Sequence, residues 1–114
     1  MIRVAILGAG ISGLFIANLF KQDPKYQITI YEKNNIISLN EGYGIQLSVN
    51  SIKLLNYIGF KELKDNEKFT PKKINFYSNN SLNKICELDI SKFNSENYEY
   101  TTLKRSSLIN FLLR

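Results

Sequence analysis

A glycine-rich turn near the N-terminus limits the folds open to this chain more than any other feature. Residues 8–13 read G-A-G-I-S-G and match the pattern G-x-G-x-x-G. An apolar run of strand length, Ile2–Leu7, precedes the turn, and apolar residues recur at helical spacing over 14–20. A β-branched and aromatic run over 27–31 follows the helix. This order predicts a parallel strand–helix–strand unit.

Each glycine of the turn stands at a position that requires the absence of a side chain. Gly8 allows the tight turn out of the strand, Gly10 lets the backbone approach a pyrophosphate, and Gly13 lets the helix pack closely on the strand. The N–H groups at the start of the helix, including those of Ile11 and Ser12, face the same point, where the helix dipole favours negative charge. The turn therefore predicts a phosphate-binding site.

An acidic residue completes the pattern. Glu32 follows the second predicted strand, about 20 residues beyond the last glycine, and can accept hydrogen bonds from ribose hydroxyls. A purely structural turn is the alternative. The strand before the turn, the helix after it and the acid at this distance together favour dinucleotide binding.

Composition excludes several other classes. The net charge of +5 comes from scattered lysines, which predicts a solvated surface and no nucleic-acid partner. The chain contains no histidine, so no metal cluster is expected. Cys86 is the only cysteine; it cannot form an intrachain disulfide, and we expect it to be half-buried in a strand. The longest apolar stretch, 11–20, is too short to span a bilayer, so we expect no transmembrane segment and a cytoplasmic location.

The remaining chain reads as short elements joined by polar turns. We first expect a loop over 33–43 with Ile36, Ile37 and Leu39 on the sheet, and then a strand over 42–47. A helix follows, with Ile52, Leu54, Leu55 and Ile58 on its apolar face and Gly59 as its cap. After it we expect a polar turn over 61–68, an antiparallel hairpin over 74–90, a loop over 91–99, a strand over 100–103 and a final helix from residue 104.

The order of three motifs resembles one family. After G-A-G-I-S-G come G-Y-G-I-Q-L-S-V-N-S-I-K-L-L-N-Y-I-G at 42–59 and L-K-R-S-S-L-I-N-F-L-L at 103–113. The order is similar to the N-terminal part of the FAD-dependent aromatic hydroxylases of the para-hydroxybenzoate and salicylate hydroxylase type. The resemblance runs from Ile2 to the last residue. It implies an α/β fold, namely an incomplete Rossmann-like FAD-binding domain with the start of an antiparallel substrate-domain sheet.

The resemblance also implies domains and site residues. Residues 1–70 would form the first part of the FAD-binding domain, 71–99 the start of an inserted substrate-binding sheet, and 100–114 the return to the FAD-binding domain. The implied cofactor contacts are Gly8, Gly10, Ile11, Ser12 and Gly13 at the pyrophosphate, Glu32 at the adenosine ribose, Lys33 beside the adenosine, Gly44, Ile45 and Gln46 on the flavin side, and Arg105 near the phosphates and ribityl chain. Alternatives remain for two of them: Arg105 as a solvated charge, and Gln46 as an inward polar residue of a strand.

Enzymes of this family reduce FAD with NADH or NADPH and use O₂ to hydroxylate a small aromatic substrate. The flavin carries out the chemistry and the protein binds and orients, so none of these residues is assigned a catalytic acid or base role. Another FAD-dependent oxidoreductase of the same fold and a non-catalytic truncated remnant are the alternatives. We expect these 114 residues alone to be inactive, because the apolar residues of the last helix would face a missing C-terminal part: Leu108, Ile109, Phe111, Leu112 and Leu113.

Overall fold

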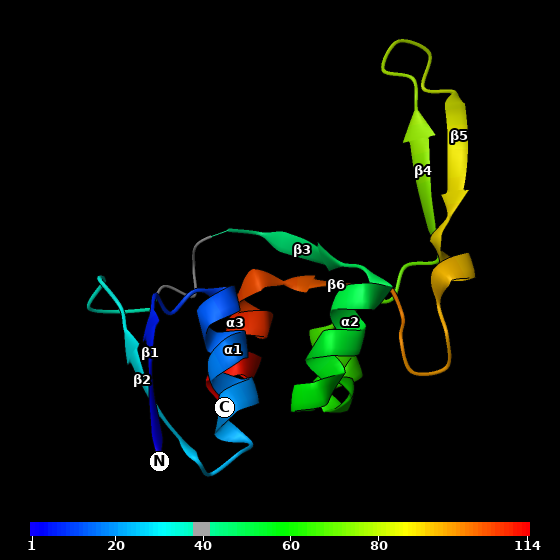
Figure 1. The fold of residues 1–114 in the computed structure, drawn as a ribbon. Coiled ribbons are helices and arrows are strands. Elements are labelled where there is room, and N and C mark those ends of the chain that lie inside the picture. Colours follow the sequence, from blue (N-terminus) through cyan, green and yellow to red (C-terminus); the bar gives the residue numbers. More distant parts are fainter. Residues whose placement is uncertain (38–41) are drawn as a thin grey trace.

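The structure is a computed structural model that describes residues 1–37 and 42–114. It measures 60 × 33 × 21 Å along its principal axes. The strands and α-helices are, in chain order, β1 (Ile2–Leu7), α1 (Ile11–Lys21), β2 (Tyr26–Tyr31), β3 (Gly44–Leu47), α2 (Val49–Leu55), β4 (Lys73–Tyr77), β5 (Lys84–Asp89), β6 (Thr101–Lys104) and α3 (Arg105–Leu113). They form a body from which the β4–β5 hairpin projects (Figure 1).

The predicted strand–helix–strand unit is confirmed. β1 and β2 run parallel with residue 2 opposite residue 26 and residue 7 opposite residue 31. α1 covers one face of this pair, and its buried Leu14 belongs to the core. The opposite face carries Arg3, Ala5, Gln27 and Thr29, all exposed. Parallel sheets are normally covered on both faces, whereas within the described residues this pair is covered on one.

The core is built around α3, contrary to our expectation. Leu108, Ile109 and Leu112 are almost fully buried rather than facing outward; only Leu113 among the predicted apolar residues is largely exposed. They pack with Phe60, whose ring meets that of Phe111 edge to face at 5.5 Å. The prediction that the apolar residues of α3 face outward was wrong. The residues that cover them come from segments far away in the sequence, which a local pattern does not reveal.

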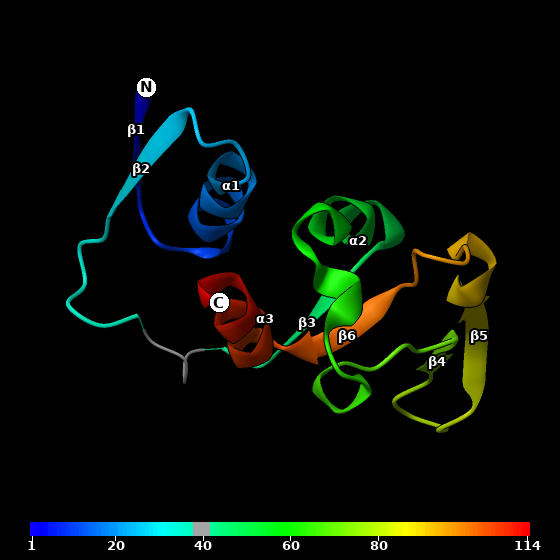
Figure 2. The same ribbon diagram turned by 90° about the horizontal axis from the view of Figure 1, so that it is seen from below.

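A side-chain amide ties α3 to α1. Nδ2 of Asn18 donates to the carbonyl oxygens of Leu14 and Leu112, both at 2.8 Å. The second bond satisfies a carbonyl in the last turn of α3, where helical partners are absent. The two helices lie side by side, with α1 next to the β1–β2 pair (Figures 1 and 2).

β3 and β6 form a short antiparallel ribbon, with Gly44 opposite Lys104 and Leu47 opposite Thr101. The ribbon buries Leu103 in the core and leads directly into α3. On its other edge, Phe69 and Thr102 exchange backbone hydrogen bonds at 2.8 and 2.7 Å. The ribbon therefore joins the middle of the sequence to its last helix.

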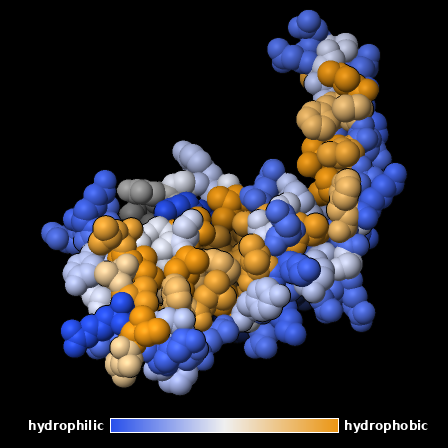
Figure 3. All heavy atoms as spheres, in the orientation of Figure 1, coloured by the Kyte–Doolittle hydropathy of each residue, from blue (hydrophilic) through white to orange (hydrophobic). Residues whose placement is uncertain are grey.

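The predicted hairpin is confirmed, but the burial expected for Cys86 is not. Cys86 lies in β5 and is exposed. It shares one face of the hairpin with Ile74, Phe76 and Leu88, while charged residues occupy the other face. Figure 3 shows this hydrophobic side along the projecting hairpin. The alternation predicted which residues share a face, whereas nothing in the described chain covers that face.

Two smaller expectations, for Leu54 and Ile36, were wrong. α2 ends at Leu55 and continues as a 3₁₀ turn to Ile58, and Leu54 is exposed rather than on the apolar face. Gly59 does cap this segment, with φ of +91°. In the loop, Ile37 packs against the core but Ile36 is exposed. Leu39 lies outside the described residues.

Over residues 1–37 and 42–114, every helix is too short or too polar to cross a lipid bilayer.

Candidate functional site

The glycine loop adopts the close packing that its sequence predicts. Gly8 has φ of +102°, a conformation that favours glycine, and its N–H donates to the carbonyl of Tyr31 at 2.7 Å. A Cβ on Gly13 would lie 2.1 Å from the carbonyl oxygen of Gly8. A Cβ on Gly10 would meet no atom within 4 Å. The loop is thus tight where helix meets strand and open where a ligand would approach.

The N-terminus of α1 is suited to an anion. Gly10 is its N-cap, so no side-chain oxygen caps the first turn, and that turn carries no acidic residue. The first hydrogen bond of the helix runs from the N–H of Leu14 to the carbonyl of Gly10 at 2.9 Å. The N–H groups of Ile11, Ser12 and Gly13 precede it and have no partner within the helix. Such groups, together with the helix dipole, bind phosphate.

Glu32 binds the glycine loop itself. The N–H of Ala9 donates to its Oε2 at 2.9 Å, and the N–H of Asn34 donates to its Oε1 at 3.3 Å. These backbone donors, the Ala9 N–H foremost, hold the pKa of Glu32 below its ordinary value and keep the carboxylate ionised. A carboxylate has about four acceptor positions, so both oxygens retain capacity for hydroxyl donors of a ligand.

A hollow of about 460 Å³ opens at this carboxyl end of the two parallel strands. It is lined by Leu7 and Gly8 from the end of β1 and by Tyr31, Glu32 and Lys33 from the end of β2. Open α/β sheets bind ligands at the carboxyl ends of their strands. The structure therefore brings the predicted glycine, acid and lysine together around one hollow.

The residues predicted for the flavin side come from other elements. Gly44, Ile45 and Gln46 belong to β3, and Arg105 is the first residue of α3. The N–H of Arg105 donates to the carbonyl of Tyr43 at 2.9 Å, which joins the start of the helix to the segment leading into β3. The side chain of Gln46 is exposed, so the alternative of an inward polar residue was wrong.

Sequence reasoning missed the hydrogen-bond partners of two predicted site residues, Glu32 and Gln46. The backbone N–H of Ala9 binds Glu32, and the hydroxyl of Tyr100 donates to Oε1 of Gln46 at 2.7 Å. Tyr100 lies diagonally across the ribbon from Gln46, because Thr102 is directly opposite Gln46. Only the strand pairing, which joins residues more than 50 positions apart, could have revealed this second contact.

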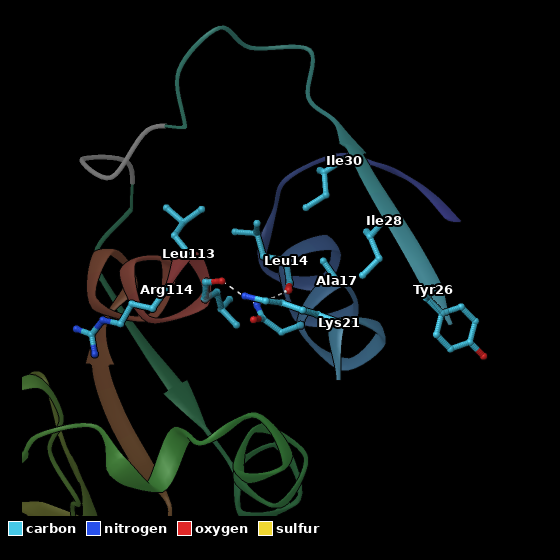
Figure 4. A pocket seen from close by; sticks show the side chains of 10 residues that line it. Leu14, Ala17, Lys21, Tyr26, Ile28, Ile30, Leu113 and Arg114 are labelled. Atoms are coloured by element: carbon cyan, nitrogen blue, oxygen red, sulfur yellow. Dashed lines mark hydrogen bonds between the residues drawn. The ribbon is translucent and has the colours of Figure 1, made fainter. Parts of the chain in front are cut away.

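A second hollow, of about 430 Å³, lies between α1, β2 and the end of α3 (Figure 4). Its walls are largely apolar, with Leu14, Ala17, Ile28 and Ile30 labelled along the helix and strand. No residue predicted for the cofactor site lines it. We interpret it as a gap over the sheet face rather than as part of the site.

Comparisons with known proteins agree with this geometry. The sequence profile of a family described as NAD(P)-binding Rossmann-like domain matches residues 6–41, which include the glycine loop and Glu32. Among curated protein sequences, none matches the chain.

Solved structures extend the similarity to the whole chain. 2-Methyl-3-hydroxypyridine-5-carboxylic acid oxygenase superposes with a TM-score of 0.80 at 21% identity, covering 99% of this chain. HpxO of Klebsiella pneumoniae, in complex with FAD and uric acid, gives 0.78 at 19% identity over 98%. 2,6-Dihydroxypyridine-3-hydroxylase of Arthrobacter nicotinovorans gives 0.69 at 17% identity over 96%.

The chain has the fold of the N-terminal part of these oxygenases. The resemblance and the fold class expected from the sequence are confirmed at this level. The chain spans 28% of the oxygenase chain, 28% of HpxO and 25% of the hydroxylase.

Proposed function

We propose that this chain is the FAD-binding N-terminal segment of a flavin-dependent monooxygenase that hydroxylates an aromatic substrate with NAD(P)H and O₂. One observation carries the proposal. The uncapped N-terminus of α1 follows the glycine loop, and the ionised carboxylate of Glu32, at the end of β2, is joined to that loop by the Ala9 N–H. A dinucleotide needs these two groups side by side, one for its pyrophosphate and one for its ribose.

The start of α1 and the residues around the hollow together suit the adenosine half of FAD. The N–H groups of Ile11, Ser12 and Gly13 would hold the pyrophosphate, and the open space beside Gly10 would admit it. Glu32 would accept hydrogen bonds from the ribose hydroxyls while remaining bound to Ala9. Lys33 lines the same hollow and would lie beside the adenosine.

The β3–β6 ribbon and the start of α3 suit the flavin half. Gly44 and Ile45 would let the backbone approach the cofactor, and Gln46 would offer its amide N–H₂, since its Oε1 accepts from Tyr100. Arg105 and the neighbouring Lys104 place positive charge at a helix N-terminus, which has no acidic residue in its first turn. Such charge would attract the cofactor phosphates. Bound FAD would supply the redox chemistry, and these residues bind and orient it.

The comparison structures support a larger enzyme around this segment. The chain matches only 28% of HpxO, a protein solved with FAD and uric acid. One face of the β1–β2 pair and one face of the hairpin are exposed and contain apolar residues, including Leu7 and Phe76. We propose that further parts of the fold cover these faces and supply most of the substrate pocket.

Nicotinamide dinucleotide at the same loop is the second candidate, because the matching family is described as NAD(P)-binding. Isothermal titration of the protein as the cell produces it, called the native polypeptide below, with FAD, NADH and NADPH separates FAD binding from nicotinamide binding. We expect tight FAD binding and, once FAD is bound, substrate-stimulated oxidation of NADH or NADPH. Tight nicotinamide binding without FAD binding would contradict the proposal and favour the second candidate.

A further inference from the structure

Gly42 and Arg105 meet just before the β3–β6 ribbon begins. Gly42 has φ of +78°. A Cβ at residue 42 would lie 2.9 Å from Cδ of Arg105 and 3.9 Å from both its Cβ and its Nε. Carbon atoms do not approach a real Cβ this closely. The aliphatic stem of Arg105 therefore crosses the backbone of Gly42 where any other side chain would begin.

The backbone holds these two residues in place. The Arg105 N–H donates to the carbonyl of Tyr43 at 2.9 Å, and Gly44 is paired with Lys104. Figure 2 shows the start of β3 beside the start of α3. Because hydrogen bonds hold the backbones of Arg105 and of Tyr43, the residue next to Gly42, we expect a side chain at residue 42 to be accommodated by turning the arginine stem. The close contact is at Cδ, in the middle of the stem, so this rotation would carry the guanidinium to a new position.

We propose that Gly42 is a positioning residue for Arg105: by lacking a Cβ it sets the path of the arginine stem and thereby the place where the guanidinium meets an anionic cofactor. The effect on binding rests on the proposed function, whereas the effect on the arginine itself does not. Gly42 would contribute to cofactor binding without itself touching the cofactor.

Gly42→Ala tests the proposal, and Gly59→Ala is its matched control. Gly59 also has a positive φ, +91°, but a Cβ there would meet no atom within 4 Å. Both variants therefore carry the same kind of backbone strain, and only Gly42→Ala crowds Arg105. Gly42→Asn and Gly59→Asn form a second pair with less strain, because asparagine tolerates positive φ; they serve if an alanine variant fails to fold.

Two measurements on the native polypeptide decide the matter. In the ligand-free protein, we expect the Nε–H NMR signal of Arg105, identified by its loss in Arg105→Ala, to shift in Gly42→Ala and to stay in place in Gly59→Ala. With FAD, we expect Gly42→Ala to weaken affinity about tenfold, the scale of one charge-assisted hydrogen bond, and Gly59→Ala to leave affinity unchanged. Gly42→Ala should add nothing to the loss already caused by Arg105→Ala.

An unmoved arginine signal would overturn the proposal, as would equal losses in the two glycine variants or additive losses in Gly42→Ala with Arg105→Ala. Failure of the unmutated protein to bind FAD would instead overturn the proposed function. The arginine signal would still decide whether Gly42 positions Arg105.

Discussion

The backbone N–H of Ala9 donates to the carboxylate of Glu32 at 2.9 Å, so the acid after β2 holds the glycine loop after β1. The conformation of the glycine loop and the position of the Glu32 carboxylate therefore depend on each other. A ligand that uses Glu32 meets a loop already set for phosphate, which lowers the ordering that binding requires.

Glu32→Gln should weaken FAD binding about tenfold while the protein stays folded. The amide removes the charge that strengthens hydrogen bonds from ribose hydroxyls and from Ala9. Flavin fluorescence titration of the native polypeptide measures the change. Glu87→Gln is the control, because Glu87 pairs with Lys73 and Lys84 on the hairpin, away from the loop. Equal affinity in the two variants would show that Glu32 is only a surface charge.

The Ala9–Glu32 bond should persist through mild acid. Hydrogen bonds hold the pKa of Glu32 below its ordinary value in the folded protein. At pH values above the pKa that Glu32 has in the unfolded chain, its ionised form therefore stabilises the folded loop. That contribution is lost as pH falls through the lower, folded pKa. The amide NMR signal of Ala9 should titrate with a midpoint below the ordinary pKa of a glutamate side chain and should lose this transition in Glu32→Gln. A midpoint above that value would contradict the hydrogen bonds described for Glu32.

Gly13→Ala and Gly10→Ala should separate stability from binding. A Cβ at residue 13 would clash with the backbone oxygen of Gly8 at 2.1 Å, and backbone cannot easily yield, so we expect a loss of about 3 kcal/mol, the upper end for overpacking, in the free energy of unfolding. A Cβ at residue 10 meets no protein atom, so only a weaker helix cap is expected, costing less than about 1 kcal/mol. Gly10→Ala should nevertheless weaken FAD binding. Chemical denaturation and FAD titration of both variants provide the comparison; a stable Gly13→Ala protein would contradict the packing.

Phe60 and Phe76 test the placement of the core. Phe60 is 1% exposed and Phe76 is 48% exposed. In the 114-residue chain, Phe60→Ala should lower the free energy of unfolding by about 3–5 kcal/mol, whereas Phe76→Ala should change it by less than about 0.5 kcal/mol. Urea denaturation of both variants measures this. Similar losses would show that the hairpin face is buried in the folded chain.

The local parts of this fold were predictable from the sequence. The glycine spacing and two apolar runs predicted β1, α1 and β2, because each depends on residues close together in the chain. The same reasoning placed Glu32 at the end of β2 and the turn between β4 and β5. The site around the hollow follows directly from these elements.

What the sequence could not predict are the contacts between distant segments. The apolar pattern of α3 predicted a buried face but not its partners, Phe60 and α1, so we expected that face to be open. The alternation around Cys86 predicted one apolar face of the hairpin but not that it stays uncovered. The bond between Tyr100 and Gln46 depends on the pairing of two strands far apart in the chain.

Hydrogen–deuterium exchange of the native polypeptide, with and without FAD, tests the central claim most directly, because it reports where amide hydrogens become protected. We predict FAD-dependent protection in peptides that contain residues 8–14 and 32–34, with a second protected segment at 104–107. The hairpin turn over residues 78–83 should exchange equally in both samples. FAD binding that leaves the exchange of residues 8–14 unchanged would contradict the claim that the glycine loop and Glu32 form the cofactor site.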